Sequence, residues 1–153
     1  MDTVRGVQFV QGSNCLVSAS EDTTIRLWDI DQFCKQDVGE GNIEAYYTMR
    51  GHASPILSLT GQGMKVNGGS EPIIASGSSD GAIKIWQAPP RKAVEPFGKS
   101  IDHQFMIASW ELAHDNEPVW DLRLNTAENL LISVGSDFSV GLWQVPQHPQ
   151  SYI

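Results

Sequence analysis

The sequence has little of what marks several classes of protein. Its 153 residues include only two cysteines. Cys15 and Cys34 are too few for a disulfide framework and do not have zinc-binding spacing. No run of about 18 apolar residues is present, so we expect no transmembrane segment. The first residues lack the basic and then apolar stretches of a secretory signal. We therefore expect a cytoplasmic protein.

Positive charge is also scarce. Lys and Arg number 10 and Asp and Glu number 18, which gives a formal net charge of −8. Because Lys and Arg supply the attraction to phosphate, this balance argues against a nucleic-acid partner. Charged residues make up 18% of the chain and hydrophobic residues 41%, so we expect a folded domain rather than a disordered segment.

The chain does contain an internal repeat. Residues 16–29, 74–87 and 131–144 align without gaps, and each copy has an Asp six residues before a Trp and a Ser four residues before that Asp. The three sets are Ser18, Asp22 and Trp28, then Ser76, Asp80 and Trp86, then Ser133, Asp137 and Trp143. Alternating apolar residues flank a short polar turn in each copy, which predicts a β-hairpin.

A matching element lies upstream of each hairpin. His52 and His114 precede short apolar strands in copies two and three, whereas copy one has such a strand without a His before it. The strand count predicts two complete four-stranded antiparallel sheets and three strands of a third. We expect repeats at residues 1–50, 51–112 and 113–146, followed by a tail at residues 147–153 that lacks apolar alternation.

This order of elements resembles the WD40 repeat, whose family builds the four-stranded blades of β-propellers. The resemblance implies an all-β fold, a portion of a WD40 β-propeller. It also implies that His, Ser, Asp and Trp of one repeat form a hydrogen-bonded set, here with His52 in copy two and His114 in copy three. Propellers close with about four to eight blades. We therefore expect the chain to be a fragment whose remaining blades come from a longer chain, or else partners that complete the ring.

The copies are further apart than WD40 repeats of about 40–45 residues require. The excess lies at residues 31–43, 61–71 and 88–106. In an antiparallel meander, these three connections fall at the same end of the sheets. The insertions therefore indicate either a binding face or tolerated variation of surface loops.

The third insertion contains Val94, Glu95, Pro96 and Phe97. Together with residues 43–60 and 117–124, it resembles an early part of the propeller of the striatin family. That resemblance implies a non-catalytic protein-interaction scaffold that helps to assemble protein phosphatase type 2A with kinases. Striatins also have a coiled coil upstream. The alternative is a WD40 adaptor of another family, such as a ubiquitin-ligase substrate receptor or a G-protein β-like subunit.

The WD40 resemblance also implies partner-binding positions. One is a residue early in the inner strand, which is Arg5, Leu57 or Trp120 in the three copies. The other precedes the turn Asp and is Glu21, Ser79 or Ser136. We expect Arg5, Leu57 and Trp120 to line the central rim. The alternative for Trp120 is a place in the core.

A repeated His-Ser-Asp set could be read as a nucleophilic triad. The Ser-Asp-Trp spacing recurs in three copies with none distinguished, and no Gly-x-Ser-x-Gly motif is present. We therefore predict a structural role and no enzyme, and a hydrolase is the remote alternative. The four histidines, which include His103 and His148, are scattered, so we expect no metal and no cofactor.

Overall fold

The computed structural model describes residues 2–10, 14–35, 44–66, 69–88 and 105–146. Three features of the sequence therefore lie outside the described residues. They are the Val94–Phe97 segment, the tail at residues 147–153, and the two histidines His103 and His148.

The described chain forms three antiparallel sheets. The first sheet has the order β1-β2-β3-β4, with β1 (Val4–Val10), β2 (Cys15–Ser20), β3 (Ile25–Asp29) and β4 (Tyr47–Met49). The second sheet has the order β5-β6-β7-β8, with β5 (Ile56–Val66), β6 (Gly69–Ser78), β7 (Ile83–Gln87) and β8 (Met106–Trp110). The third sheet consists of β9 (Val119–Asn125), β10 (Leu130–Gly135) and β11 (Val140–Gln144).

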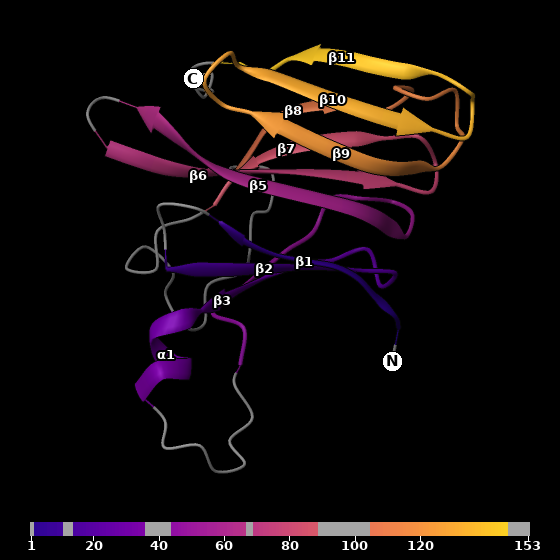
Figure 1. Cartoon of the computed structure of the whole chain (residues 1–153). Helices are drawn as coiled ribbons and strands as arrows, with labels where there is room; N and C mark the ends of the chain where they lie inside the picture. Colours follow the sequence, from indigo (N-terminus) through magenta and orange to yellow (C-terminus); the bar gives the residue numbers. More distant parts are fainter. Residues whose placement is uncertain (1, 11–13, 36–43, 67–68, 89–104, 147–153) are drawn as a thin grey trace, which may run out of the picture.

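The predicted fold class is confirmed. The sheets have four, four and three strands, and they do not close into a ring in the part of the chain that the structure describes. Figure 1 shows them stacked side by side in chain order, with the third sheet at the top. Among the described residues, no helix has the length and apolar character that a bilayer crossing requires.

Two insertions have structure of their own. The first contains a short helix, α1 (Ile30–Lys35), which the sequence did not predict. The second continues β5 and β6 as a longer hairpin, in which Lys65 pairs with Ser70. Figure 1 shows α1 and the end of this hairpin on the same side of the molecule.

The core consists of two apolar layers, one between each pair of successive sheets. We call the face that a sheet turns toward the next sheet its leading face, and the opposite face its trailing face. The first layer joins the leading face of sheet one to the trailing face of sheet two through Val17, Ala19, Ile25, Leu27, Ile56, Leu59, Ile74 and Trp86. The second layer joins sheets two and three through Ala75, Ile83, Ile85, Val119, Leu122 and Leu131.

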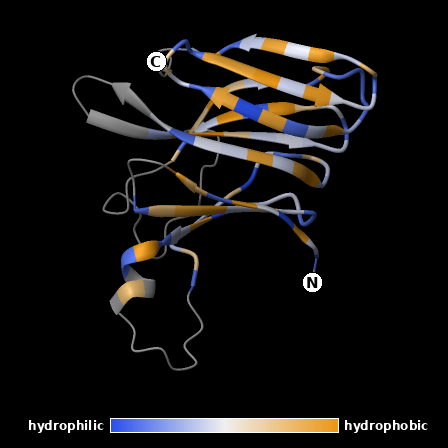
Figure 2. Ribbon diagram, in the orientation of Figure 1, coloured by the Kyte–Doolittle hydropathy of each residue, from blue (hydrophilic) through white to orange (hydrophobic). Residues whose placement is uncertain are grey.

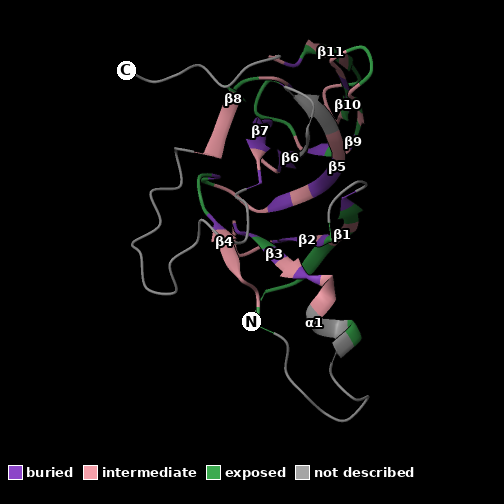
Figure 3. Ribbon diagram, turned by 90° about the vertical axis from the view of Figure 1, so that its left-hand side faces the viewer, coloured by how far each residue is buried: buried purple, intermediate pink, exposed green. Residues whose placement is uncertain are grey.

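The strand pattern explains why the middle sheet is covered on both faces. Successive side chains of a strand point to opposite faces, so β6 sends Ile74 to one layer and Ala75 to the other. Ile83 and Ile85 are fully buried, and burying such a side chain contributes about 1.5–3 kcal/mol. Figure 3 shows the resulting burial of β6 and β7 and the exposure of parts of β10 and β11.

Candidate functional site

The third sheet contains a continuous hydrogen-bond network, which is partly buried. Ser133 Oγ lies 2.7 Å from His114 Nε2 and accepts the indole N–H of Trp143 at 2.8 Å. His114 Nδ1 lies 2.8 Å from Asp137 Oδ1. Both His114 and Ser133 are fully buried. The network ties the loop before β9 to the β10–β11 hairpin.

The carboxylate of Asp137 is held in its charged form. Hydrogen bonds from the Ser139 hydroxyl and from His114 lower the pKa of Asp137 to about 2. Its Oδ1 atom also accepts the backbone N–H of Ser139 at 3.1 Å, which closes the turn. One side chain therefore both stabilises the turn and orients the imidazole.

The second sheet differs from the expected four-residue set. His52 Nε2 lies 2.6 Å from Ser76 Oγ, which accepts the Trp86 indole N–H at 2.8 Å. However, His52 Nδ1 is buried and has no hydrogen-bond partner among the described residues. The expected link from Asp80 to His52 is therefore wrong in this structure.

Other donors surround Asp80. Its Oδ1 atom accepts the Ala82 backbone N–H at 3.1 Å. Burial alone would raise the pKa of Asp80, but hydrogen bonds from Ser78, from the Ala82 backbone and from Ser54 lower it. These donors hold the carboxylate while leaving His52 Nδ1 unbonded.

A buried lysine adjoins this histidine. Lys84 Nζ donates to Ser109 Oγ at 2.8 Å and to Glu111 Oε1 at 2.5 Å. Burial, together with the positive charge of Lys84, lowers the pKa of His52 to about 4. The imidazole of His52 is therefore neutral at neutral pH.

The first sheet has the reduced set that its sequence implies. Trp28 donates its indole N–H to Ser18 Oγ at 2.9 Å. Asp22 accepts the Thr24 backbone N–H at 2.9 Å and pairs with Arg26 at 3.0 Å. An arginine thus pairs with the turn carboxylate in the copy whose sequence has no histidine before its inner strand.

These sets have the features of structural cross-links. Ser76 and Ser133 are fully buried, and each oxygen already contacts an indole and an imidazole. A nucleophilic serine needs room for a substrate carbonyl beside its oxygen. Within the described ranges, no group of three or more His, Cys, Asp or Glu side chains is arranged to hold a metal ion.

The candidate partner-binding residues lie at one end of the sheets, where the inner strand meets the hairpin turn. Backbone N–H groups of Glu21, Ser79 and Ser136 donate to carbonyls that precede the inner strands, at 2.9, 2.9 and 3.0 Å. The same two positions are therefore adjacent in all three sheets. We call this surface the rim and define it by Arg5, Glu21, Leu57, Ser79, Trp120 and Ser136.

Side chains of the rim pair with one another. Arg5 Nε donates to Glu21 Oε1 at 2.6 Å, and that bond lowers the pKa of Glu21. Trp120 donates its indole N–H to Ser136 Oγ at 2.5 Å. Sequence reasoning selected these residues singly and did not foresee the pairs. Trp120 has 58% of its surface exposed, so the alternative prediction, that this residue lies in the core, is wrong.

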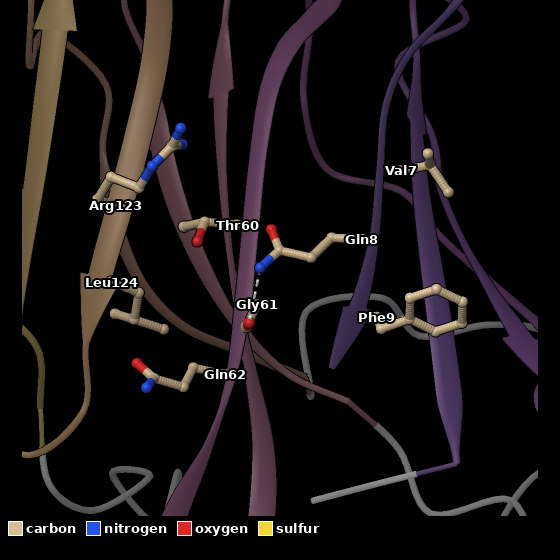
Figure 4. A pocket seen from close by; sticks show the side chains of 8 residues that line it. All are labelled: Val7, Gln8, Phe9, Thr60, Gly61, Gln62, Arg123 and Leu124. Carbon is tan, nitrogen blue, oxygen red and sulfur yellow. Dashed lines mark hydrogen bonds between the residues drawn. The ribbon is translucent and has the colours of Figure 1, made fainter. Parts of the chain in front are cut away.

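An open groove, which the sequence did not predict, runs along the inner strands of all three sheets. Figure 4 shows the side chains from β1, β5 and β9, with Gln8 Nε2 donating to the Gly61 carbonyl at 3.1 Å. The residues that line it are Val7, Gln8, Phe9, Thr60, Gly61, Gln62, Arg123 and Leu124. Its lining comes from strands more than 50 residues apart in the chain, and no local pattern marks it.

Comparison with known proteins gives consistent results. Striatin-3 of Rattus norvegicus is 31% identical over 143 residues, which cover 93% of this chain and 17% of that protein. Striatin of Mus musculus is 26% identical over 147 residues, which cover 95% of this chain and 18% of that protein. The striatin homolog of Dictyostelium discoideum is 26% identical over 157 positions, which cover 99% of this chain and 18% of that protein. The chain thus spans less than a fifth of the length of these relatives.

The pattern of the family described as "WD domain, G-beta repeat" matches three stretches, residues 1–29, 44–87 and 102–144. These stretches contain the three Ser-Asp-Trp hairpins and the strands that pair with them. With its three repeats and their sheets matched in this way, the chain belongs to the WD40 repeat family.

Proposed function

We propose that the chain is part of a non-catalytic scaffold of the striatin type, which binds other proteins through the rim. The observation that carries this proposal is Trp120. Its indole ring is exposed, yet its N–H bond to Ser136 fixes the ring at the surface. Fixed aromatic side chains and arginines are preferred anchors of protein interfaces, since little conformational entropy is lost when they bind.

The rim presents different chemistry from each sheet. Sheet one presents the Arg5–Glu21 ion pair, sheet two presents Leu57 beside Ser79, and sheet three presents Trp120. A rigid framework of antiparallel sheets holds these side chains in fixed relative positions. Such a surface suits a folded partner or an extended segment better than a small molecule.

The similarity to striatins favours this family over other WD40 adaptors. On that basis, we propose that the partners are subunits of a phosphatase type 2A and kinase assembly, and that the complex forms in the cytoplasm. The chain spans only part of its relatives, so these partners are those of the whole protein to which such repeats belong.

The test is a Trp120→Ala substitution in the full protein, followed by affinity purification and quantification of phosphatase and kinase subunits. We expect a stable protein, with an unchanged thermal midpoint, that loses at least one of these subunits. Leu112→Ala is the matched control, because Leu112 is also a large exposed apolar side chain but lies outside the rim. Full retention of these subunits by the Trp120 variant would overturn the proposal.

A further inference from the structure

Two rim residues, Leu57 and Trp120, lie where the pairing of their inner strands is irregular. The pairing of β5 with β6 passes from Ile56 to Ser58, and the pairing of β9 with β10 passes over Trp120. Each is therefore the extra residue of a β-bulge, a feature that re-aims a side chain. Leu57 belongs to the middle sheet and is still partly exposed. This position is therefore accessible even in a sheet that has a neighbour on each side.

The two bulges lie side by side. Ser58, which follows Leu57, donates its hydroxyl hydrogen to the carbonyl of Val119 at 2.9 Å, and Val119 precedes Trp120. A Cβ atom on Gly77 would come within 2.6 Å of Val119, so the two sheets are in direct contact at this point. We call the surface formed by Leu57 and Trp120 the junction surface, because it lies between sheets two and three.

A loop of acidic residues is held at the same end of these sheets. The Glu117 N–H donates to the His114 carbonyl at 2.7 Å, which closes a turn. Asp115 and Asn116 have φ angles of 48° and 64°, left-handed values that Asp and Asn tolerate. The His114 N–H donates to the Gly81 carbonyl at 3.3 Å, so the loop contacts the β6–β7 turn of sheet two. In Figure 2 the loop that leads into β9 is largely hydrophilic.

This end of sheets two and three is negatively charged. Residues 52–57, 79–82, 114–120 and 135–139 contain four carboxylates and no Lys or Arg. The carboxylates are those of Asp80, Asp115, Glu117 and Asp137. Two cations lie near these ranges in the chain, but Lys84 is buried and pairs with Glu111, and Arg50 follows β4 of sheet one. Charge complementarity therefore favours a positively charged partner here.

Trp120 determines which contact such a partner can make. Its N–H already bonds to Ser136 Oγ at 2.5 Å, so a partner meets the face or the carbon edge of the ring. The face of an aromatic ring attracts the cations of Lys and Arg, and Trp does so better than Tyr or Phe. Leu57, in contrast, offers only apolar contact.

We propose that the junction surface binds an extended protein segment that carries a Lys or Arg close to an apolar residue. The cation packs on the indole of Trp120 and is attracted by the carboxylates of Asp115 and Glu117, while the apolar side chain packs on Leu57. This inference rests on the proposed function and adds to it the charge of the partner.

The experiment selects short random peptides, displayed on phage, that bind the full protein but not its Trp120→Ala variant. We expect these peptides to be enriched in Lys or Arg close to an apolar residue. One of them is then synthesised and measured by fluorescence anisotropy. Trp120→Ala should weaken its binding by about fivefold or more, because a cation–π contact is lost.

A second variant tests the charge while Trp120 is kept. Asp115→Asn combined with Glu117→Gln removes two exposed carboxylates with little change in shape, and Asn tolerates the left-handed backbone at position 115. The synthetic peptide should bind about fivefold more weakly, and its binding should depend less on salt concentration.

Glu128→Gln is the matched control for charge. Glu128 is an exposed carboxylate in the turn between β9 and β10, at the other end of the sheet. This variant should bind the peptide as the unmodified protein does. The double variant changes exposed side chains only, so a folding defect in Trp120→Ala would leave this test intact.

The outcomes separate this inference from the proposed function. Selected peptides that lack Lys and Arg, or equal binding by the double variant, would overturn the positive charge of the partner and leave the scaffold function standing. A failure to select any peptide that requires Trp120 would also overturn the inference. The purification of phosphatase and kinase subunits would then decide the proposed function separately.

Discussion

In each of the second and third sheets, one serine hydroxyl oxygen contacts both an indole ring and an imidazole ring. Ser133 Oγ accepts the N–H of Trp143 and contacts Nε2 of His114, and Ser76 does the same for Trp86 and His52. In the first sheet Ser18 serves Trp28. The cost of losing the hydroxyl should therefore depend on the number of buried groups that it leaves unpaired.

Ser133→Ala should lower the free energy of unfolding by about 2–4 kcal/mol, because the buried imidazole of His114 and the half-buried indole of Trp143 both lose their partner. Ser18→Ala is the matched control and should cost about 1 kcal/mol, because one indole N–H is affected. Urea unfolding measures both values. Equal losses in the two variants would contradict this assignment of the bonds.

His52 should make stability depend on pH. Its folded pKa of about 4 lies below the ordinary value of 6.5, so protonation favours the unfolded chain. The stability that neutral His52 contributes is fully present above about pH 6.5. It is lost as the pH falls toward 4, by up to about 3 kcal/mol. Asp137 affects stability at lower pH, because its pKa of about 2 is below the ordinary value of 3.8. The stability that its carboxylate contributes is lost as the pH falls from about 4 to about 2.

The variant His52→Gln tests whether His52 causes the loss of stability between pH 6.5 and 4. Glutamine can still form a hydrogen bond with Ser76 but does not titrate, so the free energy of unfolding should change less between pH 6.5 and 4. The loss below pH 4 should persist in both proteins. Chemical denaturation at several pH values measures the two slopes. A slope that the substitution leaves unchanged would assign the pH dependence to another group.

At the scale of strands and sheets, equivalent positions have very different surroundings. Ile85 is fully buried between sheets two and three, whereas Leu142 is exposed on the outer face of sheet three. Ile85→Ala should cost about 2–5 kcal/mol, as truncation in a core does. Leu142→Ala should change the free energy of unfolding by less than about 0.5 kcal/mol in dilute solution. Thermal or urea unfolding provides the comparison, and similar costs would contradict the described layering.

The hairpins were predictable because the Asp-to-Trp spacing and the alternation of apolar residues are local. The extension of β5 and β6 was not, because glycines at residues 61, 63, 68 and 69 disfavour a strand by propensity. Helix α1 was missed because six residues carry too little periodicity. The burial of Lys84 was also not predictable. Charged residues are rarely buried unless they are paired, and its partner Glu111 is 27 residues away in the chain.

Candidate site residues were predictable as single positions. Their pairing was not, because Arg5 meets Glu21, and Trp120 meets Ser136, only after the turn folds back on the inner strand. The unbonded Nδ1 of His52 also depends on which donors Ser54 and Ser78 offer to Asp80. Such competition among several donors has no signature in a spacing pattern.

At the scale of the whole molecule, the middle sheet has a neighbour on each side. The outer sheets have one each, and β11 lies at a sheet edge. In stacked repeats, stability is approximately the sum of terms within each repeat and between neighbours. Backbone amides of β6 and β7 should therefore exchange more slowly than those of β11. Hydrogen exchange with mass spectrometry checks this order, and equal protection of β11 would contradict it.

The rim has a consequence for how binding specificity can change. The same two backbone positions carry an ion pair in sheet one, a leucine beside a serine in sheet two, and an indole bonded to a hydroxyl in sheet three. The framework below them is held by buried serines and by apolar layers that do not involve the rim side chains. Arg5 and Trp120 are exposed, and substitutions at exposed positions usually alter stability by less than about 0.5 kcal/mol. New partners can therefore be acquired through sheet one or sheet three separately, with little cost to folding.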